Sequence, residues 1–344
     1  MKWTLTFIFW IAVFVPVYAQ YSWKKVSEEL VVSNAPFKEC HASSLVEVSP
    51  GELLVTFFGG SGEGLNDVTV WLAKKENNKW NAPFSIASGF INDSVRFPCW
   101  NPVLFKARDG NLFLFYKVGP NPANWWGMVL TSGDNGKSWS APEKLPGGIL
   151  GPIKNKPVQL ADGTILSPSS KEENNQWKVY IERSSDLGKT WEIIPVDSNS
   201  TFKVIQPSIL IYPGQRLQIL CRSDQDNIVQ SWSGDNGKNW GALSKINLPN
   251  PNSGIDAVTL KNGWKLLVYN PTVRGKDWFN NRGKLSVAVS KDGIHWKEVA
   301  ILENGDNEEF SYPAVIQTED GQVHITYTYD RKNIKHVVLA EKNR

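Results

Sequence analysis

Residues 184–191 read Ser-Ser-Asp-Leu-Gly-Lys-Thr-Trp and define the pattern Ser-x-Asp-x-Gly-x-Thr-Trp. The pattern returns with small changes at 132–139 and 233–240, and a copy one residue shorter occupies 290–296. In each copy the aspartate can bond the nearby backbone, the glycine can take a left-handed conformation, and the tryptophan can fill the gap between neighbouring units. A local signature that returns at intervals of about 50 residues is typical of a radial repeat architecture.

A second repeat consists of a short apolar strand that runs into an Asp-Gly or similar turn. It occurs six times, at 41–51, 101–110, 156–163, 206–214, 255–263 and 312–321. Strand-like runs lie between the copies, and no stretch has the pattern of a long amphipathic helix. Six four-stranded units of about 50 residues predict an all-β fold, a six-bladed β-propeller. We expect segment 334–339 to complete the first blade with the N-terminal strand and so close the ring.

The N-terminal residues have the pattern of a secretory signal peptide, which we place at 1–19. Lys2 precedes an apolar run that ends in Val-Tyr-Ala-Gln. The alternative is an anchored helix, but the run is short for a membrane span. We therefore expect an exported protein, periplasmic or secreted, without a membrane span and with a single propeller domain over 20–344.

Composition limits the function classes. The net charge is +3 and 21% of residues are charged, without the basic stripe that nucleic-acid binding requires. Sixteen tryptophans suit both blade packing and the faces of sugars. Metal-ligand spacing of Cys and His, a phosphate-binding loop and a Gly-x-Ser-x-Gly elbow are all missing from the sequence, so we expect no cofactor, although a calcium ion in the channel stays open. We expect a monomer.

Three cysteines cannot all pair within one exported chain. Cys40 and Cys99 are candidates for a bridge between adjacent units, and the alternative is that Cys40, Cys99 and Cys221 are all buried thiols.

The second repeat also predicts a binding site. The first strand of each blade lines the central channel, and the residues at its start open onto the face where propellers usually bind ligands. Residues from all six blades should therefore converge on one funnel. Those we expect there are His41, Trp100, Asn101, Asn155, Lys156, Gln206, residues 253–256 with Asp256, and Tyr312, and Asn252 is a further candidate for substrate binding.

Together, the Asp boxes, the repeat length and the strand phrases resemble the sialidase (neuraminidase) superfamily over nearly the whole of residues 20–344. The resemblance implies three arginines that hold a sugar carboxylate, a tyrosine nucleophile assisted by a glutamate, and an aspartate acid/base. Carried onto this sequence, it assigns the second and third arginines, the tyrosine and the aspartate to Arg222, Arg282, Tyr312 and Asp67.

Two positions depart from that pattern. The phrase that should hold the first arginine reads Cys40-His41-Ala42, and the glutamate that should activate the tyrosine falls at Gln206. A neutral amide cannot take the proton of a phenol, so the ordinary sialidase mechanism lacks its base.

A second branch of the fold fits these departures better. The chain resembles the sialidase-like propellers that act on uronic acids by β-elimination, which include rhamnosyl-glucuronate lyases and oligosaccharide dehydratases. The resemblance implies an acidic oligosaccharide substrate. Arg222 and Arg282 would stabilise the charge that develops at the sugar carboxylate, and His41 and Tyr312 are the available acid–base pair. Whether a sugar or water leaves stays open.

Two other functions remain. One is an exo-α-sialidase, which needs a carboxylate near Tyr312 such as Asp256, Glu308 or Glu309. The other is a glycan-binding propeller without activity, in which His41 and Tyr312 point away from the funnel.

Overall fold

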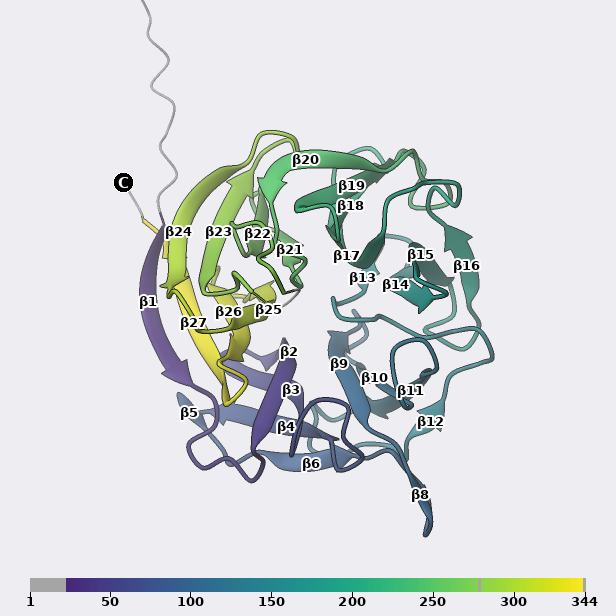
Figure 1. Cartoon of the computed structure of the whole chain (residues 1–344), viewed down its shortest axis with the longest axis vertical. Coiled ribbons are helices and arrows are strands. Elements are labelled where there is room, and N and C mark those ends of the chain that lie inside the picture. Colours follow the sequence, from purple (N-terminus) through teal and green to yellow (C-terminus); the bar gives the residue numbers. More distant parts are fainter. Residues whose placement is uncertain (1–22, 278–279, 343–344) are drawn as a thin grey trace, which may run out of the picture.

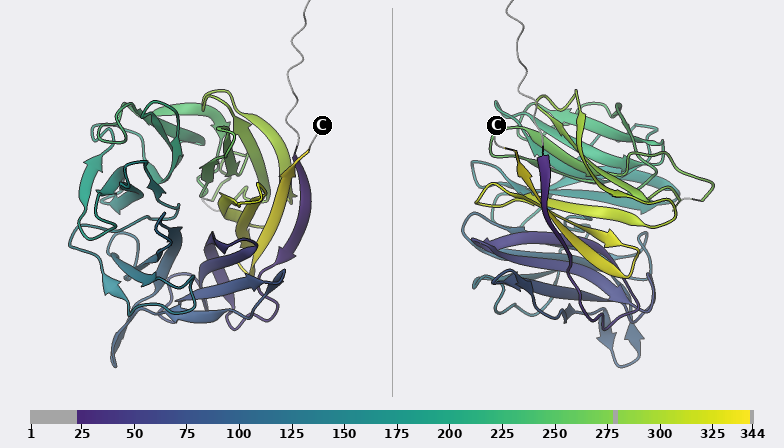
Figure 2. Two further views of the ribbon diagram at one scale, coloured as in Figure 1. Left: turned by 180° about the vertical axis from the view of Figure 1, so that it is seen from behind. Right: turned by 90° about the vertical axis from the view of Figure 1, so that its left-hand side faces the viewer.

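A computed structural model describes residues 23–277 and 280–342, and the predicted signal peptide lies outside these residues. Every regular element in this part of the chain is a strand, and no helix there is long and apolar enough to cross a membrane. Six sheets surround a central channel (Figure 1), which confirms the predicted six-bladed β-propeller. The side view shows the sheets stacked around the ring (Figure 2).

Each blade is an antiparallel meander whose first strand lines the channel. The first blade contains β2 (Glu39–Ser49), β3 (Glu52–Gly60), β4 (Thr69–Glu76), β5 (Lys79–Trp80) and β6 (Phe84–Ala87). A small hairpin of β7 (Phe90–Asn92) and β8 (Val95–Arg96) follows it and projects from the rim (Figure 1). The second blade contains β9 (Cys99–Lys106), β10 (Leu112–Val118), β11 (Trp126–Ser132) and β12 (Glu143–Lys144).

The next three blades repeat this order. The third contains β13 (Val158–Gln159), β14 (Ile165–Glu173), β15 (Gln176–Ser184) and β16 (Glu192–Pro195). The fourth contains β17 (Val204–Ile211), β18 (Leu217–Ser223), β19 (Asn227–Ser233) and β20 (Ser244–Pro249). The fifth contains β21 (Asp256–Thr259), β22 (Lys265–Tyr269), β23 (Lys284–Ser290) and β24 (Lys297–Asn304).

The last blade closes the ring. It contains β25 (Phe310–Gln317), β26 (Val323–Tyr329) and β27 (Asn333–Glu341), and the N-terminal strand β1 (Trp23–Leu30) pairs with β27 as its fourth strand. The expectation that this segment completes the first blade was therefore wrong, because β2 to β6 already fill that blade. The closure still places β2 beside β25, so His41 and Tyr312 belong to neighbouring inner strands.

All four Asp boxes form the turn between the third and fourth strands of a blade. In the fourth blade, Asp235 accepts hydrogen bonds from Ser233 Oγ at 2.8 Å and from the backbone NH of Asn239 at 2.9 Å. Trp191 donates to the carbonyl of Gly188 and packs against Phe115 of the preceding blade. The boxes are thus structural, as the sequence pattern predicts, and they lie at the opposite end of the blades from the starts of the inner strands.

Apolar side chains between adjacent sheets form the core, in clusters that each join neighbouring blades. Cys40, Cys99 and Cys221 are buried free thiols, so no bridge joins Cys40 to Cys99. Burial raises the pKa of both Cys40 and Cys99 to about 12. The cysteines therefore contribute to packing.

Candidate functional site

Four of the six inner strands begin with the same backbone irregularity. A residue with positive φ interrupts the pairing of the first two strands at Ala42 (56°), Asn101 (37°), Gln206 (55°) and Tyr312 (53°). A bulge of this kind leaves one residue unpaired and re-aims its side chain. A proline, which donates no hydrogen bond to the sheet, directly follows Asn101, Gln206 and Tyr312. The bulges turn three polar side chains towards one cavity.

Tyr312 lies at the centre of this end of the channel and is 8% exposed. Its phenol oxygen accepts a hydrogen bond from Nη1 of Arg222 at 2.5 Å. Its ring lies 4.1 Å from that of His41, and a Cβ added to Gly254 would come within 3.2 Å of it. The phenol is therefore held from two sides, and its oxygen meets a cation.

Arg222 is held by two polar side chains. Its Nε donates to Oδ1 of Asn252 at 2.7 Å, and the Nη1 that bonds Tyr312 also lies 3.4 Å from Oε1 of Gln206. Gln206 and Tyr312 thus share one guanidinium nitrogen. The position that the sialidase resemblance assigns to the activating glutamate does lie next to the phenol, and an amide occupies it.

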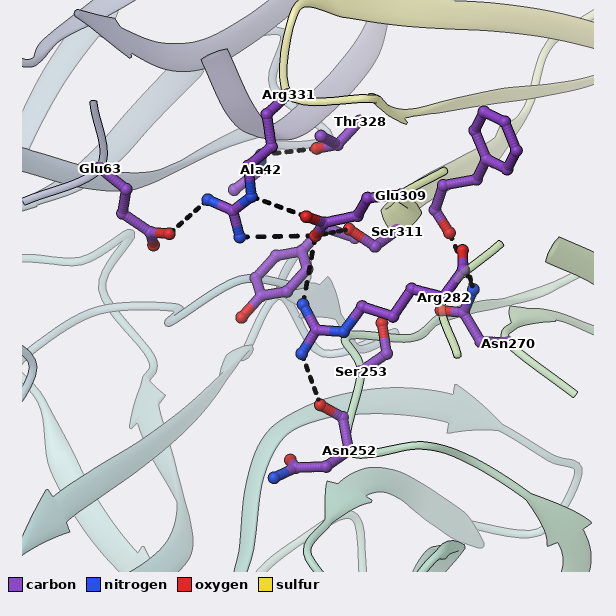
Figure 3. Close-up of polar contacts among 12 residues, drawn as sticks. Ala42, Glu63, Asn252, Ser253, Asn270, Arg282, Glu309, Ser311, Thr328 and Arg331 are labelled. Carbon is purple, nitrogen blue, oxygen red and sulfur yellow. Dashed lines mark hydrogen bonds and ion pairs between the residues drawn. The ribbon is translucent and has the colours of Figure 1, made fainter. Parts of the chain in front are cut away.

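Arg282 and Arg331 bind the two sides of Glu309 (Figure 3). Arg282 Nη1 lies 3.2 Å from Oε1 of Glu309, and Arg331 Nε lies 2.7 Å from Oε2. Arg331 also pairs with Glu63 at 2.5 Å, and Arg282 Nη2 donates to the carbonyl of Asn252 at 2.9 Å. Burial opposes ionisation of Glu309, but the positive charges of Arg331 and Arg282 and the hydrogen bonds from Arg331 outweigh it and lower the pKa of the carboxyl to about 2.

The ion-pair network fixes the arginine that reaches the cavity. Arg282 is only 1% exposed and donates to the backbone carbonyl of Asn252. The side chain of Asn252 in turn accepts a hydrogen bond from Arg222, so Arg282 positions Arg222 through Asn252. Sequence reasoning did not identify Arg331 and named Glu309 only as a possible assistant to Tyr312. The sequence feature that could have identified Glu309 and Arg331 is their position next to strands of the last blade, at the same end of the ring as Tyr312.

His41 lies behind Tyr312 and is 2% exposed. Burial, followed by the nearby charge of Arg331, lowers the pKa of its imidazole well below the ordinary value, so the ring is neutral. Its Nδ1 has no hydrogen-bond partner among the described residues. The ring packs edge-on against Phe58 and supports Tyr312 from the side away from the cavity.

A cavity of about 270 Å³ opens above Tyr312. Six predicted site residues line it, together with five residues that were not predicted as site residues. The predicted ones are Trp100, Asn101, Gln206, Arg222, Asn252 and Tyr312, and the others are Glu63, Pro122, Trp125, Glu172 and Trp177. Three tryptophans give the cavity the aromatic walls that sugar rings pack against.

Glu172 is the most informative of the unpredicted residues. It lies near the end of β14, at the edge of the cavity, and Arg222 is close enough to act on its charge. Burial raises the pKa of its carboxyl, and the neighbouring Arg222 opposes that effect only in part. No hydrogen bond or ion pair to Glu172 occurs among the described residues. The sequence feature that could have identified Glu172 is the pair of glutamates, Glu172 and Glu173, at the end of the second strand of the third blade.

Five predicted residues do not line this cavity: Arg282 and His41, whose buried positions are described above, and Lys156, Asp67 and Asp256. Asp256 is buried in the channel wall, where it accepts hydrogen bonds from Lys156, Ser208 and the backbone NH of Val315. Lys156 and Asp256 thus join the third, fourth, fifth and sixth blades below the cavity. Asp67 lies on an exposed loop, where Ser61 donates to its carboxylate at 2.6 Å. The Ser61 hydrogen bonds lower the pKa of Asp67.

Lys154 is buried beside Tyr312, with its ammonium 5.8 Å from the centre of the phenol ring. Its ammonium donates to the carbonyls of Ile255 at 3.0 Å and Pro313 at 2.6 Å, and burial lowers its pKa to about 7. Among residues 23–277 and 280–342, no group of three or more His, Cys, Asp or Glu side chains is arranged to hold a metal ion.

The comparisons with known proteins agree with this architecture. The BNR repeat-like domain matches residues 51–325, and a comparison with curated proteins finds no match. A protein of unknown function from Dyadobacter fermentans is 18% identical over 93% of this chain and all of its own, with a TM-score of 0.76. A Hadza microbial sialidase, Hz136, is 17% identical over 88% of this chain and 66% of its own, with a TM-score of 0.73.

The sialidase of Trypanosoma rangeli has a TM-score of 0.68 and 18% identity over 88% of this chain, which spans 55% of the Trypanosoma protein. At such identities the likeness concerns the fold. Because the matched domain covers most of the sequence and its blade repeats are present in the structure, the chain belongs to the BNR repeat-like domain family and has the six-bladed propeller of sialidases.

Proposed function

We propose that the protein is a carbohydrate-active lyase that eliminates the group at O4 of a uronic acid in an acidic oligosaccharide. The observation that carries the proposal is the contrast between the two carboxyls of the cavity. Glu63 is paired with Arg331, whereas Glu172 has no cationic partner among the described residues and has a raised pKa. A carboxyl whose pKa is raised is better suited to protonate a leaving oxygen than one that a cation holds ionised.

Arg222 is the residue that would bind the sugar carboxylate. It lines the cavity, Asn252 fixes its Nε, and the buried Arg282 fixes Asn252. Abstraction of H5 places negative charge on the carboxylate of the uronate, so a guanidinium already held in position lowers the energy of that state. The tryptophan walls would pack against the sugar ring.

Tyr312 is the proposed base. In its phenolate form it takes the proton from C5, and the C5–H electron pair forms the C4–C5 double bond. The C4–O4 bond breaks, and the departing oxygen takes the proton of Glu172. The products are a 4,5-unsaturated uronate and either a sugar with a free hydroxyl or water. The hydrogen bond from Arg222 fixes the phenol oxygen, and His41 and Gly254 hold the ring in place.

Glycosidic hydrolysis through a tyrosyl intermediate has less support. That mechanism needs a carboxylate to activate the tyrosine, and Gln206 occupies the position next to the phenol. Glu309 is engaged by Arg282, Arg331 and Ser311, which leaves it without a free oxygen for Tyr312. The sialidase neighbours keep this reaction as the alternative to be tested.

The test is a product assay with purified protein. Oligosaccharides with a uronate flanked by another sugar are incubated beside a fluorogenic sialoside, and ultraviolet absorbance of the conjugated double bond is recorded. The proposal predicts an absorbance rise with the uronates, lost in Tyr312→Phe and Glu172→Gln. Release of the fluorophore without any absorbance rise would contradict elimination and establish sialidase activity.

A further inference from the structure

A second cavity adjoins the one above Tyr312. Its volume is about 250 Å³, and it shares Pro122, Trp125 and Glu172 with the first cavity. Glu172 is the one titratable residue common to both among the described residues. The proposed proton donor thus lies where the two cavities meet, which is where a bond between two sugars would cross.

The walls of the second cavity resemble those of a sugar site. Trp125 and Trp126 provide aromatic surface, and the buried indole Nε1 of Trp125 has no hydrogen-bond partner among the described residues. A buried donor without an acceptor is costly unless a ligand or water supplies one. Gly147 and Gly148 form part of the rim, and a Cβ added to either would meet no atom within 4 Å. The cavity is therefore open to a ring of sugar size.

Two lysines give this cavity its charge. The ammonium of Lys144 lies 5.1 Å from the ring of Trp126, and that of Lys171 lies 5.9 Å from the ring of Tyr180. Neither has an ion pair within the part of the chain that the structure describes. Glu172 and Glu173 are the acidic residues in the lining. If Glu172 is protonated as proposed, Glu173 alone opposes the two lysines.

We propose that the second cavity binds the sugar attached to the uronate and that Lys144 and Lys171 select a sugar carrying an anionic group, a carboxylate or a sulfate. This inference rests on the proposed function for the position of the uronate. It makes the leaving group of the reaction a charged sugar in the second cavity. Lysine suits this task because its ammonium is a compact charge that binds either anion without a fixed geometry.

The test compares three uronate disaccharides whose second sugar is neutral, carboxylated or sulfated. KM is measured for the native protein, for Lys144→Ala/Lys171→Ala, and for Lys189→Ala. Lys189 is an exposed lysine in an Asp box at the opposite end of the blades, so its removal makes a control for loss of positive charge. Comparison of the carboxylated with the sulfated disaccharide shows which of the two anions the lysines select.

The inference predicts that the double variant raises KM for at least one charged disaccharide about tenfold more than for the neutral one, which corresponds to about 1.4 kcal/mol. Lys189→Ala should leave the ratio unchanged. An equal change for charged and neutral disaccharides, or no change, would overturn it.

Binding to Tyr312→Phe, followed by tryptophan fluorescence, separates the two proposals. A preference for a charged disaccharide that depends on the lysines supports the second site even if the native protein makes no unsaturated product, in which case only the proposed reaction fails. If product forms but no such preference exists in either measurement, only the second site fails.

Discussion

The two ends of each blade show how a repeat can serve both folding and function. At one end, the Asp boxes keep the same chemistry in four blades, with Ser132, Ser184, Ser233 and Ser290 each donating to the aspartate two residues later. At the other end, four inner strands keep the same backbone bulge but present different side chains. They are Ala42, Asn101, Gln206 and Tyr312.

This difference distinguishes residues that stabilise the propeller from residues that form the cavity. A turn that only has to connect two strands can use one solution in every blade. A cavity needs unlike groups on its different sides, so the bulge is retained while the residue on it changes.

Tyr312→Phe should have the largest effect on activity. It keeps the ring contacts with His41 and Gly254 but removes the oxygen that bonds Arg222. We expect kcat to fall by about 10³-fold, in the range of a lost general base. The melting temperature should stay close to that of the native protein, measured by circular dichroism. A large loss of stability with little loss of kcat would show that the phenol acts in folding.

Glu309→Gln should mainly reduce stability. It leaves Arg282, which is 1% exposed, without its carboxylate, and breaking a buried ion pair costs about 3 kcal/mol. Chemical denaturation measures the effect, and Glu308→Gln at an exposed neighbouring position is the control.

The loss of folding stability caused by Glu309→Gln should also depend on pH. The pKa of its carboxyl is lowered in the fold to about 2 from about 4.5. A lowered pKa stabilises the fold above the unfolded value, and this contribution disappears as pH falls from about 4.5 to about 2. The native protein and Glu309→Gln should therefore converge in stability at the acid end. A constant difference over that range would contradict the ion-pair account.

Glu172→Gln should lower kcat/KM by about 10²-fold. A general acid works only when protonated, so the native rate should fall as pH rises through the raised pKa of Glu172. The variant should lose that dependence. A substrate with a good leaving group at O4, such as a nitrophenol, should recover most of the rate because it needs no proton. Failure of such a substrate to recover the rate would exclude Glu172 as the acid.

Asp235→Ala should have the smallest effect. The side chain accepts hydrogen bonds from Ser233, Lys238 and Asn239 within one exposed turn, and their net worth is about 1 kcal/mol. We expect a small loss of stability and unchanged kinetics, with Asp93→Ala in the β7–β8 hairpin as the control. A clear loss of activity would show that the two ends of the blade are coupled.

Much of the architecture could be predicted because repetition is visible in one sequence. The boxes and the inner-strand phrases indicated six blades, and the starts of those strands identified Trp100, Asn101, Gln206 and Tyr312 in the cavity lining, whereas Arg222 was assigned by the sialidase resemblance. The pairing of the N-terminal strand with segment 334–339 was predicted correctly, but its assignment to the first blade was wrong, because neither strand contains a box that would mark its blade.

The rest of the site depends on geometry that the repeat does not encode. Glu172 lies on a second strand, and Trp125 lies on the connection between β10 and β11, so no shared phrase marks them. Arg331 contacts Glu309 because the turn between β26 and β27 reaches over the start of β25. His41 was correctly placed beside Tyr312, but its burial behind the ring followed from packing that the sequence does not show.

The most direct test of elimination at Tyr312 is proton NMR of the product formed from a uronate disaccharide. Our account predicts that the native protein produces a vinyl H4 signal while the H5 signal disappears, and that Tyr312→Phe leaves the substrate unchanged. A product in which the uronate keeps H5 while the glycosidic bond is broken would contradict it and identify the reaction as hydrolysis.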